Sequence, residues 1–367
     1  AQDIGYPVLV RPSYVLSGSA MQVAYDEEEL EDYLKVATDV SKEYPVVISK
    51  FLVNAKEIEV DAVSDGTNVF IGAIIEHVEE GGVHSGDATM SIPTVTIDDA
   101  VKDKIRNYTR NIAKKLEIRG PFNIQYLIRN GDVFVIECNL RASRSMPFVS
   151  KTVGINLMEL AAGAMLGENI VDGEAKVQKF AVKSPQFSFM RLEGADPVTS
   201  VDMVSTGEVA CFGKTFDEAF LKALIASGMN IPKKGDAILV TVGGEKEKIV
   251  NIVKKIANNG YKIYATEHTS EALRSNGINC EVIYKIGEDR KPNILDFLVN
   301  REFKLVINKP DPEKAEARVR SEGYLIRRKS VEYGVPVITN LELASTLANA
   351  LENYSKFGGL KNLYNYA

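Results

Sequence analysis

The chain has 367 residues, of which 45% are apolar and 26% are charged, and this composition is typical of a globular protein with two domains or more. Its net charge of -6 and its isoelectric point near 5.4 argue against a broad nucleic-acid-binding surface, because such a surface needs clustered positive charge. No apolar run approaches the 18 residues of a membrane-spanning helix, so we expect no membrane segment.

Strands predominate in the chain up to about residue 229. The periodicity predicts elements that are taken here in chain order: strand 8–11, helix 26–41, strands 46–51, 58–63 and 69–76, helix 98–116, hairpin 122–139 and helix 155–166. Thr215, with Glu218 three residues later, predicts the start of a helix that stops at Gly228. The chain enters its first strand almost at once and without a methionine. We therefore expect a piece of a longer polypeptide, although removal of an initiator methionine would leave the same start.

After a linker at 230–235, short apolar strands alternate with helices. The pattern predicts strands at 237–242, 261–265, 282–284, 304–308 and 335–338, and helices at 246–258, 270–275, 293–300, 322–333 and from 341. This alternation predicts a parallel sheet with helices on both faces, which binds ligands at the carboxyl ends of its strands. The residues just past those strand ends are Thr266, Thr269, Lys285, Asn308 and Lys309. They are either a ligand site or ordinary turn residues.

The run from Glu137 to Arg144 is the most informative part of the sequence. Glu137 and Asn139 are two apart on a predicted strand, so their oxygen-bearing side chains leave the same face. Such a pair suits a hard cation such as Mg²⁺. Arg141 and Arg144 follow, and the donors of an arginine suit planar anions such as carboxylates and phosphates. The alternative is a solvated strand end with surface ion pairs.

A third oxygen ligand depends on how the predicted hairpin closes. Gln125 lies on the strand before Glu137, and the Asn130-Gly131 pair lies in the connection between the two strands. A two-residue turn would place Gln125 opposite Ile136, whereas a loop with an odd number of residues would place it opposite Glu137. We therefore predict that a metal site containing Gln125 requires the odd loop. Cys138 would point to the other face, where we expect it to pack.

Four motifs carry a resemblance to a known family. They are Tyr6-Pro7-Val8-Leu9-Val10-Arg11-Pro12-Ser13-Tyr14-Val15-Leu16-Ser17-Gly18, residues 81–87, residues 137–151 and residues 205–209. In this order they resemble the second ATP-grasp domain of the large subunit of carbamoyl phosphate synthetase. The region after residue 235 resembles the methylglyoxal-synthase-like regulatory domain of the same subunit. The resemblance implies an α/β chain with an ATP-grasp domain at 1–166 that is incomplete at its N-terminus, the remainder of that half at 167–230, and a doubly wound methylglyoxal-synthase-like domain at 231–367.

The resemblance also implies the roles of individual residues. Arg11 would contact a phosphate of ATP, Lys50 and Leu52 would hold the adenine end, and Glu57 would bind the ribose. The residues of a mobile loop that closes over the nucleotide would be Gly82, Val83, His84 and Ser85. Three residues would be ligands of Mg²⁺ or Mn²⁺, namely Gln125, Glu137 and Asn139. Gln125 and Glu137 would also contact the nucleotide. Arg141 and Arg144 would hold the substrate anion, and the effector site would contain Lys246, Thr266, Thr269 and Lys285.

The implied activity is that of an ATP-dependent ligase whose second half phosphorylates carbamate to carbamoyl phosphate, for arginine and pyrimidine biosynthesis. The implied partners are the N-terminal half of the large subunit, a glutaminase small subunit and a small anionic effector. The Asn308-Lys309-Pro310 loop departs from the family pattern, so the identity of the effector stays open. Two alternatives also stay open: another ATP-grasp ligase such as biotin carboxylase, and a module that binds only an effector or a partner. The three widely spaced cysteines and the absence of a visible signal peptide fit a cytoplasmic location.

Overall fold

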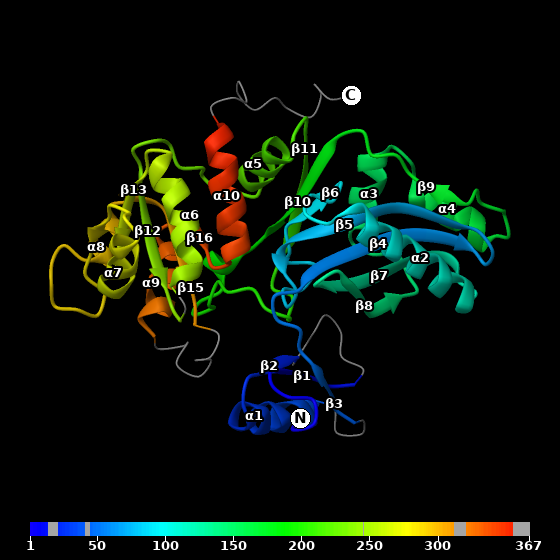
Figure 1. Ribbon diagram of the computed structural model, residues 1–367, viewed down its shortest axis with the longest axis horizontal. Coiled ribbons are helices and arrows are strands. Elements are labelled where there is room, and N and C mark those ends of the chain that lie inside the picture. The colour runs from blue at the N-terminus through cyan, green and yellow to red at the C-terminus, as the bar shows by residue number, and fades with distance from the viewer. Residues whose placement is uncertain (14–20, 41–44, 245, 312–320, 355–367) are drawn as a thin grey trace.

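The computed structural model describes residues 1–13, 21–40, 45–244, 246–311 and 321–354. Within these residues the strands form a three-stranded, an eight-stranded and a five-stranded sheet (Figure 1). No helix in the described part is long and apolar enough to cross a membrane. The middle of the predicted phosphate loop, residues 14–20, lies outside the described residues.

The small sheet is built from the first strands of the chain. Strand β1 (Val8–Arg11) lies between β2 (Gln22–Ala24) and β3 (Val47–Lys50), and both pairings are antiparallel. Helix α1 (Glu27–Val40) packs against β1 and β2. Alternate residues Val8 and Val10 are fully buried in the core beneath this helix, so the sequence periodicity accounts for the strand.

Each face of the large sheet contributes to an apolar core, and one of them, called here the polar face, also carries a row of charged side chains. Its strand order is β11-β10-β6-β5-β4-β7-β8, and β9 pairs with β5. The strands and helices of this unit are β4 (Lys56–Asp65), β5 (Val69–Glu80), β6 (Met90–Ile92), α2 (Asp99–Lys115), β7 (Arg119–Arg129), β8 (Asp132–Asn139), α3 (Met146–Val153), α4 (Leu157–Met165), β9 (Gly173–Glu174), β10 (Phe180–Gln186) and β11 (Gly207–Gly213). Ile58, Val60 and Ala62 of β4 face the core under α2. Residues 57, 59 and 61, which alternate with them, therefore line the opposite face.

The hairpin of β7 and β8 corrects one prediction. Asn130 and Gly131 have φ values of 54° and 81°, and Arg129 pairs with Asp132, so the turn has two residues. Gln125 nevertheless lies opposite Glu137, because the register shifts between Gln125 and the next residue of β7. The prediction that this pairing requires an odd loop was wrong. A β-bulge at Ile136 supplies the extra residue inside the strand instead.

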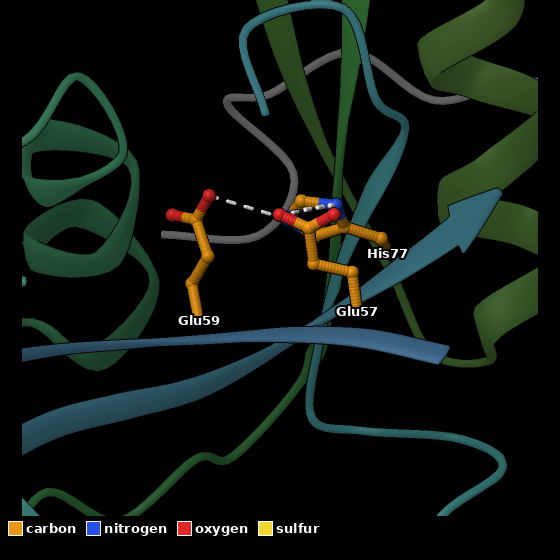
Figure 2. A group of neighbouring side chains, drawn as sticks. All are labelled: Glu57, Glu59 and His77. Carbon is orange, nitrogen blue, oxygen red and sulfur yellow. Dashed lines mark ion pairs between the residues drawn. The ribbon is translucent and has the colours of Figure 1, made fainter. Parts of the chain in front are cut away.

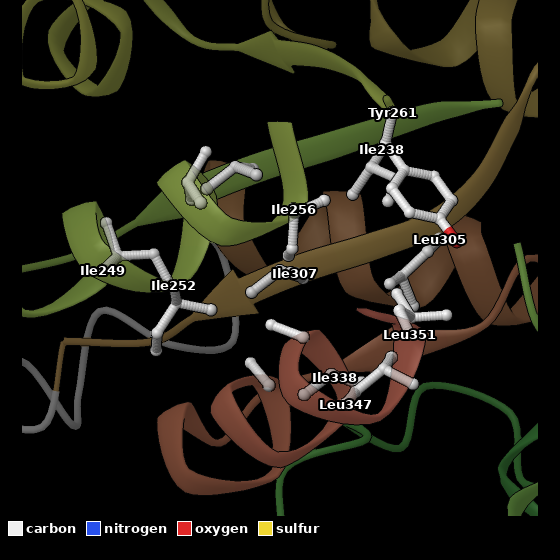
Figure 3. Close-up of a cluster of buried hydrophobic side chains, with 14 of the residues drawn as sticks. Ile238, Ile249, Ile252, Ile256, Tyr261, Leu305, Ile307, Ile338, Leu347 and Leu351 are labelled. Carbon is white, nitrogen blue, oxygen red and sulfur yellow. The ribbon is translucent and has the colours of Figure 1, made fainter. Parts of the chain in front are cut away.

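The five-stranded sheet has the predicted parallel arrangement, with the order β14-β13-β12-β15-β16. Its elements are β12 (Ala237–Val242), α6 (Glu247–Asn258), β13 (Lys262–Ala265), α7 (Glu267–Ser275), β14 (Glu281–Val282), α8 (Ile294–Val299), β15 (Phe303–Lys309), α9 (Glu322–Glu332), β16 (Val337–Ile338) and α10 (Leu341–Asn353). Figure 3 shows how apolar side chains of α6 and α10 meet those of the sheet.

One hydrophobic core joins the parallel sheet to the large sheet. Helix α5 (Phe216–Ala226) packs against β10 and β11 on one side and α10 on the other. Phe220 of α5 and Val182 of β10 belong to the same buried cluster as Ile256 of α6 and Leu347 of α10. The predicted domain limits stay a prediction, and this core crosses the limit predicted at 230.

Candidate active site

A cavity of about 990 Å³ lies between the small sheet and the polar face of the large sheet. Its lining comes from β1 and β3 on one side and from β4, β7, β8 and their loops on the other. The residues that the sequence analysis assigned to ATP, metal and substrate all line it, namely Arg11, Lys50, Leu52, Glu57, Gly82, Val83, His84, Ser85, Gln125, Glu137, Asn139, Arg141 and Arg144. The structure therefore brings together residues from five separate segments of the chain.

Lys50 has contacts that its predicted role did not include. Its Nζ donates hydrogen bonds to the carbonyl oxygens of Gly5 (2.9 Å) and Tyr6 (2.8 Å). These bonds fix the segment before β1 to the end of β3. Arg11 lies at the other end of the β1–β3 pair, opposite Val47, and is exposed.

A buried group of two carboxylates and one imidazole lies beside the cavity, and its two carboxylates, Glu57 and Glu59, line it (Figure 2). Nε2 of His77 lies 3.3 Å from Oε1 of Glu59, and Nδ1 lies 4.0 Å from Oε1 of Glu57. The contact with Glu59 lies within ion-pair distance when the imidazole is protonated, and Nε2 of His77 makes no hydrogen bond among the described residues. The ligand atoms of all three residues lie within 4.8 Å of one another, so they could hold a metal ion.

The pKa shifts in this group have opposite signs. Burial raises the pKa of Glu57 to about 7, although the charge of His77 opposes this rise. Burial also acts to raise the pKa of Glu59, but the contact and charge of His77, with the charge of Lys183, lower it overall. Burial acts to lower the pKa of His77, but the charges of Glu57 and Glu59 raise it. We conclude that His77 and Glu59 form the charged pair and that Glu57 titrates near neutrality.

The predicted metal ligands lie side by side at the edge of the sheet. Gln125 pairs with Glu137, and Asn123 pairs with Asn139 on the same two strands. Nδ2 of Asn139 donates to Oε1 of Glu137 at 2.8 Å, and Nε2 of Gln125 donates to Oε1 of Glu59 at 3.2 Å. Each of these amides also carries an oxygen. The carboxylate and amide oxygens on adjacent strands fit the ligand chemistry of Mg²⁺.

Three cations and one carboxylate line the cavity together with these predicted ligands. Arg144 lies 3.5 Å from Glu208, and Nζ of Lys183 lies 3.9 Å from the same carboxylate. Lys183 is 2% exposed, and burial lowers its pKa, against the charge of Glu208. Arg141 reaches back to Oδ1 of Asn139 at 3.4 Å. Arg141 thus contacts a predicted metal ligand, and Arg144 is oriented by a partner on β11.

The loop that follows β5 is held tightly from several sides. Gly82 has a φ of 115°, and a Cβ atom there would lie 2.8 Å from the ring of Phe51, so glycine is required. Nζ of Lys183 donates to the carbonyl oxygens of Ser85 (3.0 Å) and Gly86 (3.4 Å). The loop therefore rests on a buried cation that also faces the cavity.

The sequence analysis assigned no role to several residues in or beside the cavity. Glu59 lines it and could have been found, since it alternates with Glu57 on β4. His77 lies behind these two glutamates, on the paired strand β5. Lys183 and Glu208 lie on β10 and β11, which the periodicity did not predict. Cys138 packs against the core under α2, as predicted.

A second cavity of about 220 Å³ lies at the carboxyl ends of the parallel strands. Thr266, Lys285, Asn308 and Lys309 line it, in agreement with the predicted ligand edge. The two other predicted effector residues do not belong to its lining. Thr269 accepts a hydrogen bond from the backbone of Val242 at 3.4 Å, and Lys246 occupies the N-terminal cap of α6.

Protein-family models match both parts of the chain. The model described as carbamoyl-phosphate synthase L chain, ATP binding domain, matches residues 1–172, and the MGS-like domain model matches residues 248–339. These two matches follow the order of the antiparallel and parallel sheets.

Solved structures share the fold of the first part. They include a biotin carboxylase in complex with a nucleotide from Campylobacter jejuni (TM-score 0.51, 17% identity, 61% of this chain and 58% of that chain). They also include the biotin carboxylase domain of the 2-oxoglutarate carboxylase of Hydrogenobacter thermophilus (TM-score 0.52, 15% identity, the same coverage). These similarities, with the first family model, confirm the predicted ATP-grasp fold.

Relatives extend over nearly the whole chain. The large chain of carbamoyl phosphate synthase from Archaeoglobus fulgidus is 45% identical over 96% of this chain, and the multifunctional protein URA2 of Saccharomyces cerevisiae is 47% identical over 96%. The chain spans only 33% and 16% of these two proteins. A "carbamoyl phosphate synthase large chain, C-terminal section" from Aquifex aeolicus is 41% identical over 97% of this chain and 69% of its own length. The chain belongs to the carbamoyl phosphate synthase large chain family.

Proposed function

We propose that the larger cavity binds MgATP and carbamate and that this part of the protein transfers the γ-phosphoryl group to carbamate, giving carbamoyl phosphate. The convergence of every predicted nucleotide, metal and substrate residue on one cavity carries this proposal. The family membership and the ATP-binding domain model support it. The cavity volume of about 990 Å³ also suits a nucleotide together with a small second substrate.

The residues around the cavity suit this chemistry because phosphoryl transfer depends mainly on positioning and on neutralising charge. Glu57 would accept or donate a hydrogen bond at the ribose. Gln125, Glu137 and Asn139 would hold Mg²⁺, which neutralises charge on the phosphates when it is bound. Arg141 and Arg144 would orient the carbamate anion next to the γ-phosphate. The loop at 81–87 would exclude water, which would protect the labile carbamate.

The assembly and the regulation are proposed on the same basis. The relatives from Aquifex aeolicus and Methanocaldococcus jannaschii are named as C-terminal sections of a large chain, which supports an N-terminal half as partner. We also propose a glutaminase subunit as the ammonia source and a role in arginine and pyrimidine synthesis. Mn²⁺ would serve in place of Mg²⁺. The cavity at the end of the parallel sheet would bind a small anionic effector, because Lys285 and Lys309 line it.

A comparison of two kinds of variant tests the assignment of roles. Arg144→Ala removes a cation that faces the second substrate, so MgADP affinity should stay within about threefold, while use of carbamoyl phosphate falls by about one to four orders of magnitude. Arg141→Ala should behave in the same way. Calorimetry with MgADP and the rate of ATP formation from MgADP and carbamoyl phosphate give the two readouts. Equal losses of nucleotide and substrate affinity would contradict this assignment.

Lys151→Ala is a suitable control for these variants. Lys151 is an exposed cation close in the sequence to Arg144, and it does not belong to the lining of either cavity described here. Its removal changes the net charge by the same amount and should leave both readouts unchanged. A biotin carboxylase-like activity, the rival from the same fold, would appear as bicarbonate-dependent ATP hydrolysis that needs no carbamoyl phosphate.

A further inference from the structure

The connection between β10 and β11, residues 187–206, runs from the second cavity to the loop of the first one. Its beginning contains a 3-10 turn at Phe189–Arg191, and its end precedes β11. Two groups of contacts hold it, one to helix α9 and one to the loop at 81–87. Only three residues lie between Asp196 of the first group and Ser200 of the second.

Helix α9 holds the first part of this connection. Nε and Nη2 of Arg327 donate to the two carboxylate oxygens of Asp196, and the Nε contact measures 2.6 Å. Nη1 of Arg328 donates to the carbonyl oxygens of Phe189 and Leu192, both at 2.8 Å. Both arginines are buried and Asp196 is half-buried, so these charge-assisted bonds are partly shielded from water.

The loop at 81–87 holds the second part. The backbone N–H of His84 donates to the carbonyl oxygen of Ser200 at 2.7 Å. The carboxylate of Asp87, which is 2% exposed, accepts from the backbone N–H groups of Val204 and Ser205, both at 2.9 Å. Met203, which lies between Ser200 and Val204 in the sequence, lines the first cavity. Displacement of the connection would therefore remove hydrogen bonds from the loop that is proposed to cover the nucleotide.

Arg327, which holds Asp196 of the connection, also lines the second cavity. Its Nη1 donates to Oδ1 of Asn308 at 2.7 Å, and Asn308 lies at the end of β15 on the wall of the same cavity. Lys285 and Lys309 bring further positive charge there. An anion that enters this cavity meets a guanidinium whose negative partner, Asp196, belongs to the connection.

We propose that the Arg327–Asp196 pair couples the two cavities: an anion in the second cavity competes with Asp196 for Arg327 and so loosens the 187–206 connection and the loop at 81–87. This inference rests on the effector role proposed for the second cavity, and it adds the physical contact through which that cavity acts. Two arrangements follow, with Arg327 bound either to Asp196 or to the anion. A coupling of this kind is reciprocal, so nucleotide binding should weaken anion binding by the same factor.

Hydrogen exchange on the full chain without nucleotide tests this coupling directly. Asp196→Asn removes the charge that holds Arg327 but keeps the size of the side chain. We expect exchange at the amides of His84, Val204 and Ser205 to become about 5–150-fold faster than in the unmodified protein, the usual range of such couplings. Inorganic phosphate, added to the unmodified protein as the anion, should raise exchange at Val204 and Ser205 and should have no further effect on Asp196→Asn.

Glu174→Gln is the matched control. Glu174 accepts two hydrogen bonds from Arg106, at 2.6 Å and 3.1 Å, in the same bidentate arrangement, and it lies outside both cavity linings. This variant should leave exchange at His84 unchanged. Unchanged exchange in Asp196→Asn would overturn the coupling, and so would phosphate that slows exchange at Val204 and Ser205 or leaves it unchanged. Since no nucleotide is present, these outcomes are independent of whether the first cavity binds ATP.

Discussion

The buried carboxyl group of Glu57 should make the stability of the protein depend on pH. Its side chain is 6% exposed, and its pKa rises from the ordinary value of 4.5 to about 7. At about 1.4 kcal/mol for each pKa unit, this rise corresponds to about 3 kcal/mol between the two protonation states. The folded protein therefore holds the Glu57 proton more tightly than the unfolded chain does, between pH 4.5 and about 7.

The sign of the effect follows from this difference. As the pH rises through that window, the Glu57 carboxyl ionises in the unfolded chain but stays protonated in the folded protein, so Glu57 lowers the free energy of unfolding progressively. Glu57→Gln has a similar shape and no charge. Near pH 4.5 the variant should be about as stable as the unmodified protein, and by pH 8 it should be more stable by up to about 3 kcal/mol.

Urea denaturation at several pH values, followed by circular dichroism, gives the difference between the two proteins. Glu271→Gln, which changes an exposed glutamate on α7, is the control and should show no such trend. Parallel stability curves for Glu57→Gln and the unmodified protein would refute the argument, because they would mean that Glu57 has the same proton affinity in both states. The same variant should also bind MgADP more weakly if Glu57 contacts the ribose.

Two further predictions concern the fold. Phe220→Ala opens a cavity in the core shared by the large sheet and the parallel sheet, and it should lower the free energy of unfolding by about 3–5 kcal/mol. Hydrogen exchange should then become faster in β10 and β12 together. Faster exchange in one sheet alone would argue against a shared core. Gly131→Ala should lower the free energy of unfolding, measured by urea denaturation, by about 1–2 kcal/mol. A Cβ atom there would have no neighbour within 4 Å, so the cost comes only from the φ of 81°. An unchanged denaturation midpoint would show that the turn relaxes.

The sequence predicted the parts of the fold that depend on periodicity. Alternation of Glu57 and Ile58 places the carboxyl in the cavity and the apolar side chain under α2, and the parallel sheet follows from the regular order of its strands and helices. Short-range patterns could not locate the bulge at Ile136. A bulge depends on how the polar and apolar faces of two paired strands fit together, and both candidate registers were compatible with the turn sequence.

The parts of the site that were missed depend on long-range contacts. Lys183 and Glu208 lie on two strands whose polar residues weaken the apolar pattern, and their charges become meaningful only beside Arg144. Asp196 and Arg327 are 131 positions apart in the sequence. No local pattern indicates such a pair, because its stability comes from burial and from a geometry that the tertiary fold creates.

The central claim is that the larger cavity transfers a phosphoryl group between a nucleotide and carbamate, and the reverse reaction measures this directly. With MgADP and carbamoyl phosphate, and without bicarbonate or glutamine, the chain should form ATP. Glu137→Gln weakens the proposed metal site and should lower that rate by about two orders of magnitude or more. ATP formation at the full rate in Glu137→Gln, or none by the folded, unmodified chain, would contradict the account.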